Sequence, residues 1–477
     1  MSLPRLWAFL AIALPALGAV IANLPSVDLT YQLRAGAEIL GGLGIPTHDT
    51  WTFTAFGQPW TNQQWGAQVV FAAAFDVAGW TGLVLLRAAL TGLIFGCLYR
   101  IGRGRGLIAR DAALLSLAAF AVSAVALGLR AQLLGMAIFA VVLVLVTERR
   151  SHPRRLWLVP LLVLVWANVH GSFFLGPVVL GLAWIEDLHD GVRPPHRALA
   201  VAVVSVAAAC VTPFGPAVWT YALGLSTNPS VTRRITEWQP TSLRDVPGLL
   251  FFGSAMAIVV AMARRGSRTA WPTLAWLGTF FVIGAFAIRG VAWWPLGAVA
   301  AIAGVLVTSR RGSDGQLVEM QGTPLLRRLD AVIAGVIVVA GVALLPVWRP
   351  TDPGLQAPQG VIGMAPPGIT ATIRELARPG DRLFQPQPWG SWFEWEFPDL
   401  PVAVDSRIEM FPASVWDAYE GVTAGVEGWQ AQLASWGVTI AVVGYDDADL
   451  AARLGANGWR QVHHDADGWV FLAPTRT

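Results

Sequence analysis

Charged residues are scarce in this chain of 477 residues, which is 13% charged and 55% hydrophobic. Globular proteins average about 25% charged residues, so the composition excludes an ordinary globular protein. Lysine is absent, and the arginines form no basic stripe outside short loops, which argues against a nucleic-acid partner. The two cysteines, Cys97 and Cys210, both fall in apolar runs, which predicts buried thiols and implies no disulfide framework.

What the chain has instead is a series of apolar runs, each roughly 17–25 residues long and able to cross a bilayer. They predict an α-helical polytopic membrane protein with about 11 transmembrane helices. The expected spans are 5–24, 80–101, 109–128, 131–147, 155–170, 172–189, 197–213, 248–264, 271–288, 291–308 and 330–347. The first run also resembles a signal peptide, but its length and the loop that follows favour its retention.

Arginine placement predicts the orientation of these spans. With the N-terminus inside, the basic loops at 100–110, 148–155, 190–197, 263–268 and 308–328 all face the cytoplasm, and the C-terminus lies outside. The loop at 214–247 is the exception, because it carries Arg233, Arg234 and Arg244 and yet must be external. The expected location is the bacterial plasma membrane, with the C-terminal part extracytoplasmic.

Composition changes after residue 348, which predicts three regions. Residues 1–348 form the transmembrane domain, whose first external loop at 25–79 carries interfacial helices. Residues 349–369 form a Pro/Gly-rich linker, and 370–477 form a soluble extracytoplasmic α/β domain. Strand-like segments "RLFQPQ", "PVAVDSR", "TIAVVGYD" and "VHHDADGWVFLAP" alternate with helical ones there, which predicts a largely parallel sheet. No glycine-rich phosphate fingerprint occurs in that domain.

The first external loop begins with "SVDLTYQLRAGAEILGGLG". Apolar residues at Leu29, Leu33, Ala37 and Leu40 predict an amphipathic helix lying on the membrane. That helix would hold Asp28 close to the end of the first span. The aromatic segment before the second span predicts another interfacial helix.

The predicted topology places many polar residues on the external side. Acids of the first loop and arginines of other loops are expected to line one external cavity, because an ionisable group at such depth is costly unless it is wet or paired. Such a cavity suits a ligand with a phosphate-like anion and a hydroxyl or amine. The external polar residues are Asp28, Arg34, Glu38, His48, Asp49, Gln64, Arg130, Gln132, Asn168, His170, Arg233, Arg234, Glu237 and Arg289.

The ordered set of motifs resembles the GT-C superfamily of integral-membrane glycosyltransferases, which includes protein O-mannosyltransferases and lipid-A aminoarabinose transferases. The resemblance is closest to a bacterial, largely uncharacterised GT-C-like branch. It spans nearly the whole chain through "VDLTYQLRAGAEILGGLGIPTHDTWTFTAFGQPWTNQQW", "LRAQLLG", "WANVHGSFFLG", "TPFGPAVW", "ITEWQPT" and "PWGSWFEWEFPDLPVAVDSRIEMF". The chain departs from that pattern in two ways. Asp28 has no acidic neighbour, and Gln63–Gln64 stands where relatives often carry His–Glu.

The resemblance implies a transferase that moves a sugar from a polyprenyl-phosphate donor to a glycan, lipid or protein acceptor outside the membrane. It implies Asp28 as the general base, and Arg289 and Arg130 as ligands of the donor phosphate, with Arg233 and Arg234 behind them. Some GT-C enzymes use a divalent cation, but no metal ligands are assigned here. Possible acceptor or supporting residues are Arg34, His48, Asp49, Gln64, Asn168, His170, Glu237, Asp405 and Arg407.

Several signals have a second interpretation. Asp28 also suits the capping of an interfacial helix, Arg289 and Arg130 also suit contact with lipid headgroups, and Asn168 with His170 also suits bridging between spans. Asp405, Arg407 and Glu409 alternate after a predicted strand, where an internal salt bridge is as plausible as a ligand site. "HHDAD" at 463–467 is more typical of a solvated turn than of a metal site.

Two other functions remain open on the sequence. One is a GT-C-like membrane protein without catalysis, which binds lipid-linked glycans or assists envelope assembly. The Gln63–Gln64 pair favours it, because glutamine cannot take a proton. The other is a solute transporter. It is disfavoured because we find no internal repeat and expect no charge buried in the middle of a span.

Overall fold

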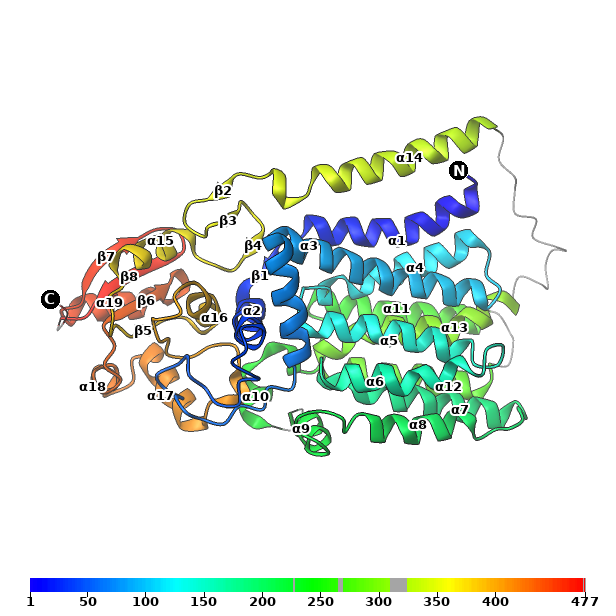
Figure 1. The fold of residues 1–477 in the computed structure, drawn as a ribbon, viewed down its shortest axis with the longest axis horizontal. Helices are drawn as coiled ribbons and strands as arrows, with labels where there is room; N and C mark the ends of the chain where they lie inside the picture. Colours follow the sequence, from blue (N-terminus) through cyan, green and yellow to red (C-terminus); the bar gives the residue numbers. More distant parts are fainter. Residues whose placement is uncertain (226–227, 265–268, 309–323, 475, 477) are drawn as a thin grey trace. The chain divides into compact units, whose positions relative to one another are not determined.

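The computed structural model describes residues 1–477 except 226–227, 265–268, 309–323, 475 and 477. Two compact units are present, and the chain passes between them more than once (Figure 1). The helical unit contains residues 1–22 and 84–345, and the mixed unit contains residues 23–83 and 346–477. Most of the predicted basic loop at 308–328, and residues 265–268 of the loop at 263–268, lie outside the described residues.

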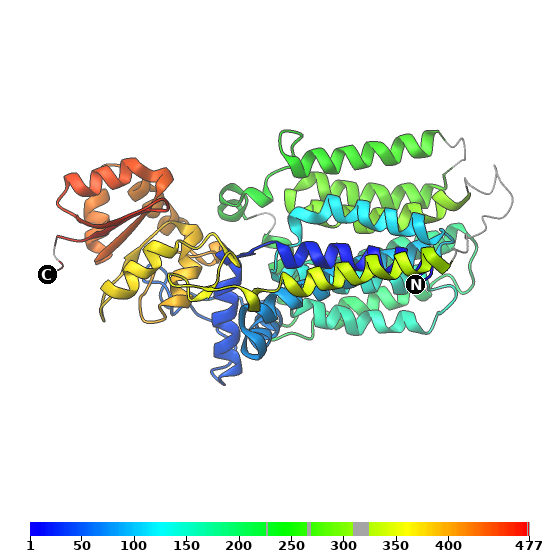
Figure 2. The same ribbon diagram turned by 90° about the horizontal axis from the view of Figure 1, so that it is seen from above.

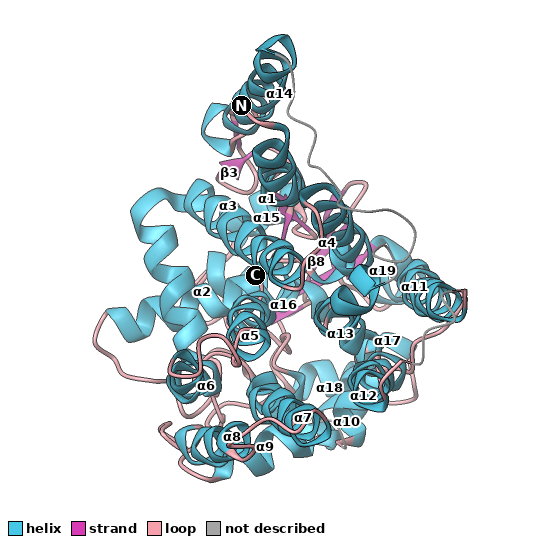
Figure 3. Cartoon of the chain, turned by 90° about the vertical axis from the view of Figure 1, so that its right-hand side faces the viewer, coloured by secondary structure: helices cyan, strands magenta, loops and turns pink. Residues whose placement is uncertain are grey.

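The helical unit is built from long apolar helices that run side by side, seen end on in Figure 3. Its helices are α1 (Leu3–Ile21), the later part of α3 (Trp65–Gly104), α4 (Ala109–Ser123), α5 (Ala131–Thr147), α6 (Val159–Ala167), α7 (Leu175–His189), α8 (Arg197–Ala208), α9 (Ala217–Leu225), α10 (Pro229–Arg234), α11 (Val246–Ala263), α12 (Trp271–Phe286), α13 (Trp294–Thr308) and α14 (Pro324–Ala343).

Aromatic side chains hold the centre of this bundle. Phe139 of α5 contacts Trp166 of α6, Phe280 of α12 and Trp293, with ring centroids 5.8, 5.7 and 5.5 Å apart. Tilted and edge-on ring pairs at these distances stabilise packing beyond the burial of area. At the periphery, α1 packs against α4 and α14 (Figure 1).

Each predicted span coincides with a helix, but only some of these helices are long enough to cross a membrane. Within the part of the chain that the structure describes, six helices are long and apolar enough to cross a membrane, namely Leu3–Ile21, Trp65–Gly104, Ala109–Ala126, Gly171–His189, Val246–Ala263 and Ile288–Val307. Four further apolar helices are shorter, at Ala131–Thr147, Arg155–Ala167, Arg197–Ala208 and Trp271–Phe286. These helices support a multi-pass membrane protein, while the number of spans and their orientation stay predictions.

Arg87 is a buried charge that lies beside the end of α1 rather than in the middle of a span. It lies on α3, is 2% exposed, and donates hydrogen bonds to the carbonyl oxygens of Ala19 and Ala22. The last carbonyls of a helix have no partner within that helix. Arg87 therefore satisfies the C-terminal end of α1, and its burial has a structural cause.

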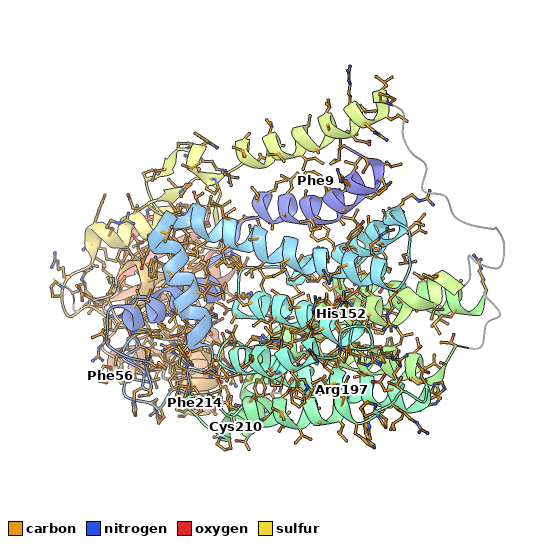
Figure 4. All side chains as sticks on the ribbon, turned by 45° about the vertical axis from the view of Figure 1, so that its right-hand side comes forward. Phe9, Phe56, His152, Arg197, Cys210 and Phe214 are labelled. Atoms are coloured by element: carbon orange, nitrogen blue, oxygen red, sulfur yellow. The ribbon has the colours of Figure 1, made fainter. Side chains whose placement is uncertain are left out.

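Both cysteines are free in the structure. Cys97 is buried on α3, as predicted, whereas Cys210 is only half-buried. It lies just beyond the end of α8, close to Phe214 and at the opposite end of that helix from Arg197 (Figure 4).

The mixed unit combines the first loop with the C-terminal region. Its helices are α2 (Ser26–Leu40), the start of α3, α15 (Pro367–Leu376), α16 (Gln387–Glu396), α17 (Ala413–Ala424), α18 (Trp429–Ser435) and α19 (Ala448–Ala456). Its strands are β1 (Leu24–Pro25), β2 (Thr351–Asp352), β3 (Ala357–Pro358), β4 (Ile362–Gly363), β5 (Leu383–Phe384), β6 (Ile440–Gly444), β7 (Arg460–His464) and β8 (Gly468–Leu472). The first loop thus belongs to this unit, a grouping that differs from the predicted division at 348.

The four-stranded sheet of the mixed unit has both parallel and antiparallel strand pairs, so the prediction of a largely parallel sheet is wrong. Its strand order is β5-β6-β8-β7, in which β5 and β6 are parallel and both other pairs are antiparallel. The reason is the segment 460–472, which forms a hairpin where one long strand was expected. α19 lies along this sheet and contacts β6 and β8 (Figure 2).

The predicted strand "PVAVDSR" forms isolated bridges in place of a regular strand. Val402 pairs with Leu383 of β5 and with Thr52 of the first loop. Phe53 N donates to Val402 O at 3.1 Å, which extends the contact. Residues 401–403 therefore lie between the first loop and β5, and they join two parts of the chain that are far apart in sequence.

Helix α2 packs against α16 within the mixed unit. Leu29 and Leu33 are fully buried, whereas Ala37 and Leu40 are exposed, so only the first half of the predicted apolar face is covered. Gly36 permits the close approach of the start of α3, because a Cβ there would lie 2.1 Å from the carbonyl oxygen of Gln68. Non-helical backbone at Ala78 and Gly79 then separates the first segment of α3 from its long apolar part.

Candidate functional site

Three of the predicted residues meet in the helical unit. Arg130 Nη1 donates to Glu237 Oε1, and Arg289 Nη2 donates to Glu237 Oε2 at 3.3 Å. Each carboxylate oxygen therefore takes one guanidinium. We call Arg130, Glu237 and Arg289 the arginine–glutamate bridge.

Short turns between helices position these three side chains. Arg130 is the residue immediately before α5, Arg289 lies in the 3₁₀ turn η5 (Ile288–Ala292), and Glu237 lies in η4 (Thr236–Trp238). The Ile288 amide donates to Gln239 O at 3.0 Å, which holds η4 beside η5. Gln132 Nε2 approaches Arg289 O at 3.4 Å and links α5 to the same turn.

The Arg289 guanidinium lies over the ring of Trp238, with its carbon 4.5 Å from the ring centroid. A guanidinium over an indole face is stabilised electrostatically. The three charged side chains stay reachable from solvent, since 29% of each arginine side chain and 36% of Glu237 are exposed. The bridge is therefore an accessible site rather than a buried salt bridge.

Glu237 is ionised in this setting. Partial burial opposes the charge, but Arg130 and Arg289 outweigh it and lower the pKa of Glu237 below its usual range. Two guanidinium charges and one carboxylate charge leave the bridge with one net positive charge.

The other predicted residues of the helical unit lie elsewhere in local structure. Arg233 is exposed and Arg234 half-buried at the end of α10. Asn168 Nδ2 donates to Leu164 O and Val211 O, both at 2.9 Å. The second bond joins the end of α6 to the segment after α8. His170 Nδ1 lies 2.7 Å from Ser172 Oγ and precedes the turn η3 (Gly171–Phe174). The Asn168 bond to Val211 joins two spans, as its structural interpretation expects, whereas the His170 contact with Ser172 is local.

Asp28 lies in the first turn of α2, in the mixed unit. The hydroxyl of Ser406 donates to Val27 O, so the segment after residue 405 crosses this end of the helix. Burial raises the pKa of Tyr31 well above its usual range, and the charges of Asp28 and Glu409 raise it further. Glu409 is therefore an acid of the same neighbourhood, and this proximity to Asp28 could not be predicted across 380 intervening residues.

Arg34 fastens α2 to α16 and the loop after it. Its Nη1 donates to Glu394 O at 2.6 Å, and its Nη2 donates to Pro398 O at 3.3 Å. The guanidinium also lies 4.9 Å from the ring centroid of Trp51. Arg34 therefore stabilises the packing of the mixed unit.

Gln64 and His48 have modest contacts. Gln64 Oε1 accepts from Gln32 Nε2 at 3.3 Å, and Gln32 also approaches the Tyr31 hydroxyl at 3.4 Å. His48 is exposed and its Nδ1 lies 3.0 Å from Thr47 Oγ1. An amide pair thus stands beside Tyr31.

Asp49, Asp405 and Arg407 form a fully buried ion cluster. Arg407 Nη2 donates to Asp49 Oδ1 at 2.6 Å, and Arg407 Nε donates to Asp405 Oδ2 at 2.9 Å. Asp49 also accepts the Thr52 hydroxyl at 2.6 Å. The Arg407 guanidinium packs against both Trp51 and Trp60, 4.2 and 4.7 Å from their ring centroids. The internal salt bridge is the interpretation that the structure favours for Asp405 and Arg407.

Glu394 is the third acid near Arg407, and it is also fully buried. Its Oε2 lies 4.0 Å from Arg407 Nη2, and among the described residues no hydrogen-bond donor reaches either carboxylate oxygen. Burial raises the pKa of Glu394 well above its usual range, and the Asp405 charge raises it further. Glu394 therefore holds a proton that it would lose in the unfolded chain.

Glu394→Gln should flatten the fall of stability with pH. Because the folded-state pKa of Glu394 is raised, the folded chain binds one more proton than the unfolded chain above the ordinary glutamate range, so stability falls as pH rises toward the folded pKa. A glutamine has no proton to lose. Thermal unfolding of both proteins is compared between about pH 5 and pH 8. The free energy of unfolding of the variant, relative to that of the unchanged protein, should rise with pH by about 1.4 kcal/mol for each pH unit until the folded-state pKa is reached. Parallel curves would contradict the assignment.

No group of three or more His, Cys, Asp or Glu side chains able to hold a metal ion occurs among the described residues. The "HHDAD" segment forms the β7–β8 hairpin turn, where His463 Nε2 lies 2.9 Å from Asp465 Oδ2. This contact fits the turn that its sequence suggests.

No family model matches this chain, and no curated protein is similar to it in sequence. Solved structures are similar in fold. The oligosaccharyltransferase AglB of Archaeoglobus fulgidus, in complex with an inhibitory peptide and a dolichol-phosphate, is 12% identical with a TM-score of 0.57, and the match covers 98% of this chain and 74% of AglB. ArnT of Cupriavidus metallidurans in the apo state is 15% identical with a TM-score of 0.52, and the match covers 97% of this chain and 96% of ArnT.

The chain has a GT-C-like fold. The apo form of the A. fulgidus oligosaccharyltransferase agrees, at 13% identity and a TM-score of 0.57 over 99% of this chain and 74% of its own. The resemblance in fold that the sequence motifs predicted is therefore confirmed. At these identities the similarity shows the fold alone, and the roles of the site residues have to be argued from their own contacts.

Proposed function

We propose that this GT-C-like protein is a membrane glycosyltransferase that moves a sugar from a polyprenyl-phosphate donor to an extracytoplasmic acceptor. The observation that carries the proposal is the arginine–glutamate bridge, in which two guanidiniums from separate turns converge at an accessible site. Paired arginines are typical ligands of phosphate. The fold neighbours support it, since one was solved with a dolichol-phosphate.

The proposed reaction inverts the anomeric carbon. The acceptor hydroxyl attacks that carbon, the bond from the carbon to the phosphate oxygen breaks, and the hydroxyl proton passes to the Asp28 carboxylate. The polyprenyl phosphate leaves with the electron pair of the broken bond. Arg130 and Arg289 would stabilise the charge that develops on its oxygen through fixed donors. The site is proposed to face the extracytoplasmic side of a bacterial plasma membrane.

A non-catalytic binder of lipid-linked glycans is the second candidate. The hydrogen bond between Gln32 and Gln64 favours it, because this amide pair beside Tyr31 cannot accept a proton from an acceptor. Such a protein would keep the phosphate site and have no turnover.

The test uses the purified full chain with a panel of polyprenyl-phosphate sugars and measures both donor binding and release of polyprenyl phosphate. Binding with release supports a transferase. Binding without release for any donor and acceptor supports the binder. If Arg289→Gln binds every donor as tightly as the unchanged protein, the phosphate site is wrongly assigned.

A further inference from the structure

The function proposed above assigns Arg130 and Arg289 to the donor phosphate but gives Glu237 no role. Glu237 nevertheless makes an ionic contact with each guanidinium, one through each carboxylate oxygen. A carboxylate in the middle of an anion site is unexpected, because it occupies donors and opposes a second anion. Its presence calls for a physical explanation.

We propose that Glu237 is a specificity-determining residue that restricts the site to donors with one negative charge at the phosphate. The inference rests on the proposed function. With Glu237 ionised, the two guanidiniums and the carboxylate carry one net positive charge. That charge matches a sugar phosphodiester, which has one negative charge, and it mismatches a diphosphate-linked sugar, which has two.

The hydrogen-bond capacity of arginine allows the carboxylate and a phosphate to share the pair. A guanidinium has five N–H donors in a planar fork. Glu237 takes one from Arg130 and one from Arg289. Glu237 can thus stay in place when a phosphodiester binds, whereas a second phosphate group would bring another charge close to the carboxylate.

The position of Glu237 in the fold keeps it at the site. Trp238, the next residue, lies against the Arg289 guanidinium, and Gln239 O accepts from the Ile288 amide of the turn that holds Arg289. The turn η4, which carries Glu237, is therefore held against the turn η5, which carries Arg289. Like charges a few ångströms apart repel each other more strongly near a protein surface than in bulk water, so the carboxylate opposes the second charge of a diphosphate.

The test compares two probes that share one lipid and differ in charge, so that the unknown sugar does not matter. They are farnesyl methyl phosphate, with one negative charge, and farnesyl methyl diphosphate, with two. Affinity of the full chain for each is measured at one fixed salt concentration. The variants are Glu237→Gln, Arg289→Gln and, as a matched control, Glu427→Gln, which changes an exposed glutamate of the mixed unit.

The unchanged protein and Glu427→Gln should prefer the monophosphate. Glu237→Gln should bind the diphosphate roughly tenfold more tightly or better and gain less for the monophosphate, so that the preference narrows or inverts. Equal gains for both probes, no change, or weaker binding of both would overturn the role of Glu237. The proposed function fails separately, if the unchanged protein binds neither probe or Arg289→Gln binds both unchanged.

Discussion

Asp28→Asn should lower the rate of sugar transfer by roughly 10²–10⁴-fold and leave donor binding intact. Asparagine keeps the size and the hydrogen-bonding shape of aspartate, but it cannot take the proton of the acceptor. Asp28 lies in the first turn of α2, where asparagine also suits the helix end, so the fold should tolerate the change. Single-turnover transfer with saturating donor measures the effect.

Asp399→Asn is the matched control, because Asp399 is an exposed acid of the same mixed unit. It should transfer sugar at the unchanged rate. Transfer by Asp28→Asn at the rate of this control would remove Asp28 as the base and return it to helix capping. A parallel loss of donor binding would show that the variant is damaged more widely than at one proton acceptor.

Arg407→Met should destabilise the mixed unit by about 3–5 kcal/mol, the largest stability effect that we expect in the chain. Arg407 is 1% exposed and pairs with Asp405 and Asp49, which are fully buried. Methionine fills part of the space that the Arg407 side chain occupies against Trp51 and Trp60, but it leaves those carboxylates without their counter-ion. Thermal unfolding followed by tryptophan fluorescence should shift down by on the order of 10 °C.

Two further variants give this prediction its controls. Arg460→Met removes an exposed arginine of the same unit and should have little effect. Arg407→Lys keeps the charge but not the planar fork that serves Asp49 and Asp405 together, so it should fall between the other two. If Arg407→Met unfolds like Arg460→Met, the buried cluster contributes little to stability.

The elements of the helical unit could be predicted because their signal is local. A run of apolar side chains long enough to cross a bilayer specifies a helix whatever packs around it. The same holds for α15, α17, α18 and α19, whose periodic apolar residues mark one buried face. The partners of Arg87 could not be predicted, because the carbonyls of Ala19 and Ala22 lie 65 or more residues earlier in the chain.

Strand pairing was predicted less well. The sequence suggested a turn at 463–467, but it did not reveal that this turn folds β7 back onto β8 as an antiparallel hairpin. Whether residues 401–403 form a regular strand depends on Thr52 and Leu383, their partners on either side. Register and direction in a sheet are set by such partners rather than by the strand itself.

By itself, the sequence determined that this protein has many apolar helices and a GT-C-like order of motifs, and it selected Arg130, Glu237 and Arg289 as polar residues near helix ends. Only the tertiary structure decided which of them pair, and that Asp405 and Arg407 serve a buried cluster with Asp49. The physical reason is range. Hydrophobic length and periodicity act over a few turns of one segment, whereas an ion pair requires two distant segments to bring charged atoms within about 4 Å of each other.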